Sequence, residues 1–380
     1  MDIRFSIAGR AGRVDADHPI WTEVLSMPVR SVPADQGKAA AITHGEYFQA
    51  IQTYFQNEGG LHLRSALQGL DPEASSLPVP ERIDVVLEKH GEFYHPARIR
   101  TTSPGRSRPF VLNVAATPTG FKWMDNEIEA LRQVLPRLPE GSVPRVYGRG
   151  GAESANGVRF RMFLADWFEG FHEFHLAVDP RDGAQKIVVW DNRPTPFFLP
   201  ANLTKDVYYQ TAFLLARAYD PRTTRQIYPW HHASGDFVLR HLEEGLELKL
   251  ISVRQYASTL AVEGGQAPDE ESRQMAAMVF FANLTLRNRI DRFDGTGKMA
   301  WAGDAAVAPT VAGFRQALTD SQIDALRGLL ANYDTDDWIA LLTAVGAQYL
   351  LMPVEKALLA RHTASHAVCL LEAIQREFHV

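Results

Sequence analysis

Two stretches of the chain combine histidines with an aspartate, side chains that commonly bind transition metals or move protons. His172 and His175 are three residues apart, a spacing that would place both on one face of a helix. His231 and His232 come shortly before Asp236. Two arrangements are open. Together these side chains form a zinc or iron site with an open coordination position, or the histidines hydrogen-bond to backbone and carboxylate groups around a loop.

The densest charged stretch runs from Arg287 to Gly297. Asp291 and Asp294 could bind a cation there, and the arginines could meet a phosphate group. The stretch is too short and too irregular for an EF-hand loop. The favoured interpretation is an arginine–aspartate network that closes the end of a helix onto a glycine turn.

The composition is that of a globular protein. The 380 residues are 46% hydrophobic and 22% charged, enough for a large buried core in two lobes. A formal net charge of −6 offers no general basic field for nucleic acid. Asp2 and Arg4 argue against a signal peptide, and no apolar run reaches the ~18 residues of a membrane span. The single cysteine, Cys369, cannot form an intrachain disulfide, which fits a reducing compartment. Together these features predict a soluble, cytoplasmic protein that binds neither nucleic acid nor membrane.

Hydrophobic periodicity predicts the elements that must position these residues. Strands are predicted at Ile83–Glu88, Phe93–Thr101, Phe110–Ala115, Pro144–Gly148 and Arg159–Leu164, with short strand pairs at Lys186–Phe198 and Phe237–Val253. Helices are predicted at Tyr47–Phe55, Trp123–Leu138, Phe171–Val178, Thr204–Tyr219, Asp320–Asn332, Asp337–Leu351 and Val354–Phe378. Five strands with one helix after the third, followed by a mainly helical region, make an α+β two-lobe layout.

Four segments in this order resemble the protein-kinase-like superfamily, including its small-molecule phosphotransferase and pseudokinase branch. Phe110–Ala115 resembles the third strand of the small lobe, and Leu164–Gly170 resembles the hinge between the lobes. Trp230–Phe237 resembles the catalytic loop, and Leu248–Arg254 resembles the strand that normally ends in the metal-binding Asp-Phe-Gly. The resemblance covers about residues 83–255.

The resemblance implies a chemistry of positioning and charge neutralisation around a phosphoryl group, and the chain departs from it at several positions. Asp236 matches the base that accepts the proton of a hydroxyl. Asn113 stands where a lysine would hold phosphate oxygens, while His241 and Ser252 stand where asparagine and aspartate would hold Mg²⁺. Only Gly91 remains of the glycine-rich phosphate loop.

The resemblance also implies where a ligand binds: a nucleotide such as ATP, or another small polar or anionic molecule, in the cleft between the lobes. The candidate catalytic residues are Asp236 and His232. The candidate ligand-binding residues are Asn113, Glu127, Asp166, Glu169, Ser252 and Arg254. Glu127 could instead cap its helix or face solvent, and Arg254 is also expected to serve as a structural ion-pair partner.

The predicted layout is an N-terminal extension (1–80), a five-stranded antiparallel small lobe with one helix (81–165), a mainly helical large lobe (166–305) and a C-terminal helical extension (306–380). The apolar stripes of the last helices serve either as core or as the surface of a homo-oligomer. Three functions stay open. The chain transfers a phosphoryl or related group to a small-molecule hydroxyl, or it is a non-catalytic pseudokinase that binds or scaffolds, or it is a His/Asp metal-dependent enzyme.

Overall fold

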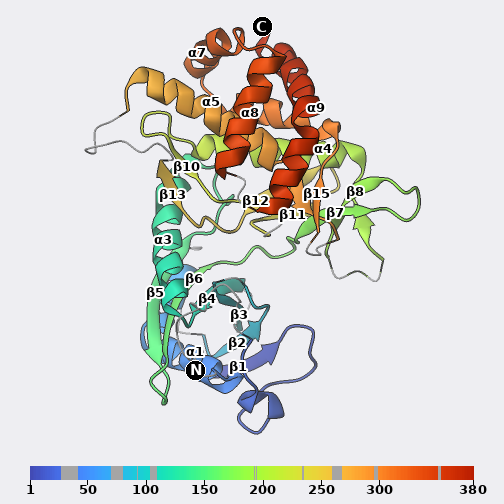
Figure 1. Ribbon diagram of the computed structural model, residues 1–380. Coiled ribbons are helices and arrows are strands. Elements are labelled where there is room, and N and C mark those ends of the chain that lie inside the picture. The colour runs from blue at the N-terminus through green and yellow to red at the C-terminus, as the bar shows by residue number, and fades with distance from the viewer. Residues whose placement is uncertain are drawn as a thin grey trace. The chain divides into compact units, whose positions relative to one another are not determined.

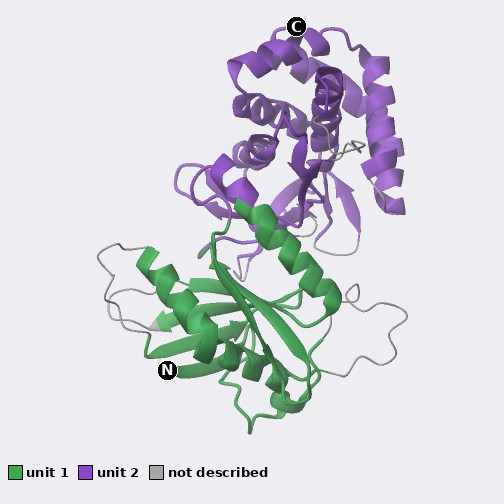
Figure 2. Cartoon of the chain, turned by 90° about the vertical axis from the view of Figure 1, so that its left-hand side faces the viewer, with its two compact units in different colours: residues 1–132, 144–169 green, residues 133–143, 170–380 purple. Residues whose placement is uncertain are grey.

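The computed structural model describes residues 1–26, 42–69, 80–91, 93–102, 109–191, 193, 195–232, 235–258, 268–294, 298–349 and 352–380. They form two compact units, each treated by itself below: unit 1 (1–132 and 144–169) and unit 2 (133–143 and 170–380) (Figure 2). The fold is mixed α+β, as predicted, and its strand pairs are mainly antiparallel. The predicted glycine turn at Gly295 and Gly297 lies outside the described residues.

Unit 1 contains a six-stranded sheet in the order β1-β2-β3-β4-β6-β5 (Figure 1). Its strands are β1 (Asp2–Ile7), β2 (Arg82–Leu87), β3 (His95–Thr102), β4 (Pro109–Ala115), β5 (Val146–Glu153) and β6 (Arg159–Asp166). The five predicted strands are present, and β1 is added at one edge, parallel to β2, while the other pairs are antiparallel. The segment predicted as an N-terminal extension therefore contributes a strand to this sheet.

Helices cover both faces of the sheet in unit 1. They are α1 (His44–Tyr54), α2 (Gly60–Gly69) and α3 (Pro118–Val134), with short helical turns η1 (Pro19–Thr22) and η3 (Phe55–Gly59). The apolar face of α1 shares a core with Met162 of β6, whereas Met124 and Ile128 of α3 pack with Phe163. Because neighbouring residues of a strand point to opposite faces, the single strand β6 serves both cores.

Unit 2 is mainly helical and holds several small sheets. Its helices are α4 (Ala201–Ala218), α5 (Glu270–Arg287), α6 (Val307–Ala317), α7 (Asp320–Leu330), α8 (Thr335–Tyr349) and α9 (Pro353–Phe378), with helical turns η5 (Leu135–Arg137) and η8 (Asp304–Ala306). Its strands are β7 (Phe174–Val178), β8 (Gln185–Val189), β9 (Phe197–Phe198), β10 (Arg225–Ile227), β11 (Phe237–His241), β12 (Leu246–Leu250), β13 (Tyr256–Ser258), β14 (Ile290–Arg292) and β15 (Met299–Trp301). Helix α6 packs against α4 and α9, so the predicted C-terminal extension belongs to the same compact unit. Among the described residues, no helix has both the length and the apolar character needed to cross a bilayer.

The helix predicted at Phe171–Val178 is wrong. Residues 174–178 form strand β7, which pairs antiparallel with β8. The local sequence pattern suggested a helix, but the partner strand β8 supplies backbone hydrogen bonds that this pattern could not reveal. His175 lies in β7, whereas His172 lies before that strand and forms an isolated bridge with Leu239 of β11, so the two histidines do not share a helix face.

Candidate functional site

The eight predicted site residues are divided between the two units. Unit 1 contains Asn113, Glu127, Asp166 and Glu169, and unit 2 contains His232, Asp236, Ser252 and Arg254.

Asp236 directly precedes β11 and is buried, with 1% of its surface exposed. Gly235, in the left-handed region at φ = +66°, lets the chain turn sharply into this strand. Oδ2 of Asp236 accepts two hydrogen bonds, one from the His231 N–H (2.7 Å) and one from Nη1 of Arg254 (2.6 Å). The Arg254 side chain is 14% exposed, so the ion pair is largely removed from water. Arg254 is thus the structural ion-pair partner that the sequence predicted.

The second oxygen of Asp236, Oδ1, is in a different situation. It is buried and has no hydrogen-bond partner among the described residues. Several other buried side-chain atoms of this chain are in the same situation, and each one loses its hydration without replacement. Oδ1 is therefore an acceptor with capacity for one further donor, such as a hydroxyl or amine of a small molecule.

His232 is buried in an aromatic environment made by Phe174, Trp230 and Phe237. Its Nε2 lies 2.8 Å from Oδ1 of Asn288. The Asn288 amide nitrogen donates to the carbonyl oxygen of Tyr208 and to Oγ1 of Thr310, which identifies Oδ1 as the acceptor toward the histidine.

The proton of neutral His232 is consequently on Nε2, and Nδ1 is an acceptor. Burial lowers the pKa of His232 below its ordinary value, which keeps the ring neutral. The ring is held by packing and by Asn288. These contacts fix the ring in the loop that carries Asp236, and its buried Nδ1 has no hydrogen-bond partner among the described residues.

The other histidines are bound to separate partners. Nε2 of His231 contacts Oε1 of Glu355 at 2.8 Å, which ties this loop to the first turn of α9. Nδ1 of His175 contacts Oδ1 of Asp291 at 2.9 Å, and both side chains are buried. Across the described ranges, no group of three or more His, Cys, Asp or Glu side chains is arranged to hold a metal ion. The hydrogen-bonding interpretation of the histidines is the one that the geometry supports.

The arginine–aspartate stretch after α5 forms a hydrogen-bonded network around the buried side chains of Arg289 and Asp291. Arg289 donates to the carbonyl oxygen of Ala302 (2.9 Å) and to Oδ1 of Asp304 (2.7 Å). Asp291 accepts from the N–H of Leu176 (3.0 Å) in addition to its contact with His175. These contacts join β7, β14 and the end of α5, and agree with the structural interpretation rather than with a cation site.

The positions that would hold Mg²⁺ do not converge on Asp236. The five residues that follow Asp236 form the extended strand β11, so His241 is about 16 Å farther along the chain at roughly 3.3 Å per residue. The His241 ring contacts Phe197 instead, with 5.2 Å between ring centroids. Ser252 follows Ile251, whose N–H donates to the backbone oxygen of Asp236 (2.8 Å), but its hydroxyl carries no charge to offset a divalent cation. These residues do not fit a magnesium-bound triphosphate.

In unit 1, Asp166 has a clear structural role. It is buried at the end of β6, where its Oδ2 accepts from the N–H of Arg145 (2.9 Å) and its Oδ1 accepts from the hydroxyl of Tyr147 (2.8 Å). The carboxylate therefore fastens the start of β5 to the end of β6.

The remaining unit 1 candidates differ in exposure. Glu127 of α3 is 4% exposed and does not face solvent, whereas Glu129 is exposed and pairs with Arg132 (2.7 Å). Glu169 is exposed and pairs with Arg100 (2.8 Å). Asn113 is half-buried in the middle of β4, opposite Phe163 of β6.

Sequence reasoning missed two residues that shape the unit 2 site. Asn288, which fixes His232, lies in the charged stretch that the sequence did single out, but its partner is 56 residues away. Glu355, which holds His231, is 124 residues distant and carries no local signal.

No protein-family model matches the chain, and no curated protein matches it. Solved structures that resemble it include "WaaP in complex with acyl carrier protein" (TM-score 0.32, 12% identity, 67% of this chain and 84% of that one). A Neurospora crassa PAN3 pseudokinase mutant is also similar (TM-score 0.26, 14% identity, 85% of this chain and 74% of that one). So is a kinase domain (TM-score 0.28, 8% identity, 77% of this chain and 85% of that one). These neighbours are kinase-like, and scores this low carry no argument about activity.

Proposed function

We propose that this chain is a kinase-like binding module that anchors a small polar ligand on Asp236 of unit 2, without magnesium-dependent phosphoryl transfer. The observation that carries the proposal is the buried Oδ1 of Asp236, which has no partner among the described residues. A ligand hydroxyl or amine that donates to this oxygen would satisfy it. Arg254 balances the carboxylate charge, so the site accepts a donor without first taking up a cation.

The path of the chain after Asp236 supports a function without magnesium-dependent phosphoryl transfer. A magnesium site needs oxygen ligands that meet within about 2.0–2.1 Å of one ion. Strand β11 carries residue 241 away from Asp236, and residue 252 is a serine. The lysine, asparagine and aspartate that the kinase-like resemblance would place around a triphosphate have no counterpart in these side chains.

Thermal unfolding of the purified chain with ATP and with adenosine, each in excess Mg²⁺ or in EDTA, tests the proposal. A bound probe at 100 times its Kd raises the free energy of unfolding by about 2.7 kcal/mol. We expect the same shift with and without Mg²⁺, and a lower affinity for Asp236→Asn. His241→Ala is the matched control, because its ring lies at the far end of β11 and should not alter binding. A shift that requires Mg²⁺, or no shift with either probe, would contradict the proposal for nucleotides.

A second function rests on the same atom. Oδ1 of Asp236 is an acceptor that could take a proton from a ligand hydroxyl, which is the role of a general base. Turnover separates the two functions. A transferase loses turnover in Asp236→Asn while it largely retains ligand binding, whereas a binding module shows no turnover in either form.

A further inference from the structure

Strand β5 forms one edge of the unit 1 sheet, with β6 as its strand neighbour among the described residues. Two of its glycines are required by close packing on one face. A Cβ at Gly148 would lie 2.2 Å from Cγ of His62, and a Cβ at Gly150 would lie 2.3 Å from Oε2 of Glu58. Because side chains alternate along a strand, Arg149 and Gly151 face the opposite side, toward α3.

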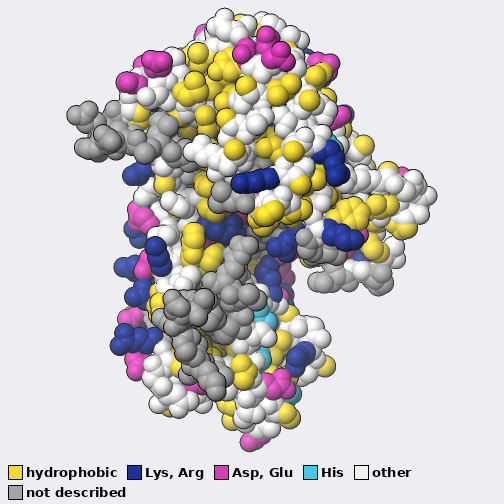
Figure 3. All heavy atoms as spheres, viewed as in Figure 1, with side chains coloured by type: hydrophobic (Ala, Val, Ile, Leu, Met, Phe, Trp, Pro, Cys, Tyr) yellow, Lys and Arg dark blue, Asp and Glu magenta, His cyan; other side chains and the backbone are white. Residues whose placement is uncertain are grey.

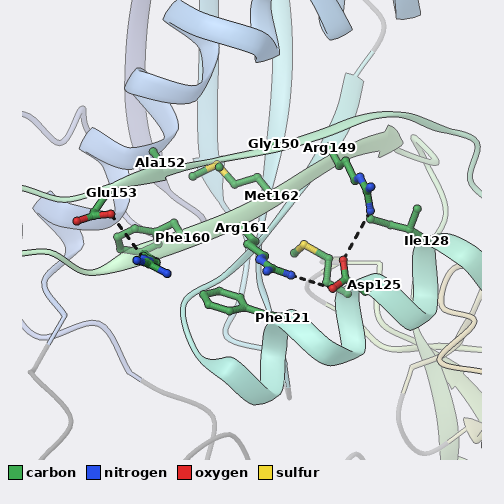
Figure 4. Close-up of a pocket in the computed structure, with 13 residues that line it drawn as sticks. Phe121, Asp125, Ile128, Arg149, Gly150, Ala152, Glu153, Phe160, Arg161 and Met162 are labelled. Carbon is green, nitrogen blue, oxygen red and sulfur yellow. Dashed lines mark hydrogen bonds and ion pairs between the residues drawn. The ribbon is translucent and has the colours of Figure 1, made fainter.

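A groove of about 800 Å³ lies on that opposite side, between α3 and the β5–β6 hairpin (Figure 4). Helix α3 contributes Phe121, Met124 and Ile128 to its wall. Residue 151 has no side chain to fill the space, and a Cβ there would lie 2.5 Å from the carbonyl oxygen of Phe160. The groove thus runs along an edge strand and has an apolar wall.

The charges in the groove are unequal. Asp125 is the common partner of two arginines, Arg161 at 2.8 Å and Arg149 at 3.8 Å. The guanidinium of Arg161 also lies 5.0 Å from the ring centroid of Phe121. Because one carboxylate serves two guanidinium groups, this part of the groove keeps a surplus positive charge. The side chains of Arg149 and Arg161 are 70% and 50% exposed, so both are accessible.

A second pair, Arg159 and Glu153 at 3.6 Å, lies toward the other end of the groove and is balanced (Figure 4). Figure 3 shows Lys and Arg side chains alternating with Asp and Glu down the side of the molecule where α3 and β5 lie. Arg149 and Arg161 share one carboxylate, Asp125, and their surplus positive charge complements an anionic side chain.

We propose that the edge of β5 and this groove bind an extended acidic segment of a partner protein by strand addition. The backbone of the segment pairs with the outer edge of β5. Alternate side chains of an added strand lie roughly 6.6 Å apart on one face. One acidic side chain then meets Arg149 and Arg161, and an apolar neighbour on the same face packs against Phe121. This surface is independent of the ligand site proposed in unit 2.

Fluorescence anisotropy of the full chain tests the proposal, with a labelled peptide of three Glu-Val repeats as the probe and one of three Lys-Val repeats as its control. We expect the acidic peptide alone to bind. Arg149→Glu should weaken its binding roughly tenfold or more, because a charged hydrogen bond is lost and a like charge is introduced. Asp125→Asn should strengthen binding roughly two- to fivefold, because the competing carboxylate is removed.

The matched control variant is Arg4→Glu, which makes the same charge change on β1, the opposite edge of the same sheet. It should leave the affinity unchanged. Methylating alternate backbone nitrogens of the acidic peptide, at either the odd or the even positions, removes N–H donors that strand pairing needs. One of these two methylated peptides should bind at least tenfold more weakly than the unmethylated peptide. Strand addition would be overturned if the acidic peptide did not bind, or if Arg4→Glu and Arg149→Glu weakened its binding equally. It would also be overturned if both methylated peptides, or single-stranded oligo-dT, bound as tightly as the unmethylated acidic peptide.

Discussion

Two buried aspartates, Asp166 in unit 1 and Asp236 in unit 2, are held by different kinds of donor. Both oxygens of Asp166 accept hydrogen bonds from neutral groups, the Tyr147 hydroxyl of the neighbouring strand β5 and the N–H of Arg145 just before it. Asp236 instead receives a cation, Arg254, and a backbone N–H on one oxygen. Its other oxygen has no partner among the described residues.

This difference in hydrogen bonding distinguishes a carboxylate that stabilises the fold from one that can still bind a ligand. A carboxylate whose two oxygens are satisfied by its own hairpin contributes to the stability of that hairpin. A carboxylate with a buried acceptor to spare, neutralised by an arginine, can receive a further donor at small electrostatic cost. Asp166 therefore belongs to the framework of unit 1, and Asp236 is the better candidate for contact with a ligand.

The largest expected effect comes from removing Arg254. Arg254→Met leaves the Asp236 carboxylate buried without its cation, which should lower the free energy of unfolding of unit 2 by about 3–5 kcal/mol. Urea denaturation followed by circular dichroism measures the loss.

Arg100→Met is the matched control in unit 1. Its ion pair with Glu169 is exposed, so its loss should cost less than about 1 kcal/mol. The double variant Asp236→Asn with Arg254→Met should recover much of the stability, because neither charge remains. Equal losses for Arg254→Met and Arg100→Met would mean that Asp236 is not held as a buried charge.

A second prediction concerns pH, where the two units should behave alike. Burial, reinforced by nearby cationic or histidine groups, lowers the pKa of His95 in unit 1 and of His366 in unit 2 to about 3. The unfolded chain takes up these protons near pH 6.5, so the stabilisation is complete above that pH and is lost as the pH falls toward 3. Between pH 6.5 and 5, each histidine should cost about 2 kcal/mol of stability.

Urea unfolding at pH 7, 6 and 5 measures this dependence, and His366→Gln provides the comparison. Glutamine offers polar groups toward Arg289 and Thr285, the present partners of His366, but does not titrate. We expect the variant to lose stability less steeply than the native chain. The same slope in both would show that His366 is not the group that takes up the proton.

Much of the fold could be predicted wherever the determining contacts are local. The β2–β3 and β11–β12 hairpins follow from alternating apolar residues and from turns that join neighbouring strands. Strand β1 was not foreseen because its partner, β2, begins 80 residues later, with Asp2 opposite Arg82. Strand β7 was misassigned because its backbone hydrogen bonds to the partner strand β8 leave no signal in the local pattern.

The candidate site shows the same limit. The ion pair of Asp236 and Arg254 could be anticipated, because the β11–β12 hairpin brings its two ends together. The contact between His231 and Glu355 could not, because it joins segments far apart in the sequence. Nor does residue type reveal that both oxygens of Asp166 accept hydrogen bonds, since that depends on Tyr147 of β5 and on Arg145 just before that strand.

The smallest expected effect tests whether Asp166 is indeed saturated and structural. Tyr147→Phe removes the hydroxyl that donates to Oδ1 of Asp166 and keeps the aromatic ring, which packs edge-on against Phe110 at 5.6 Å. The free energy of unfolding of unit 1 should fall by about 1 kcal/mol, while ligand binding at Asp236 is unchanged. Tyr219→Phe in unit 2 is the informative control, because the buried Tyr219 hydroxyl has no hydrogen-bond partner among the described residues and its removal should be neutral or stabilising. If both variants lose the same stability, the cost comes from the altered ring and not from the hydrogen bond, and the distinction between a saturated Asp166 and an unsaturated Asp236 loses its support.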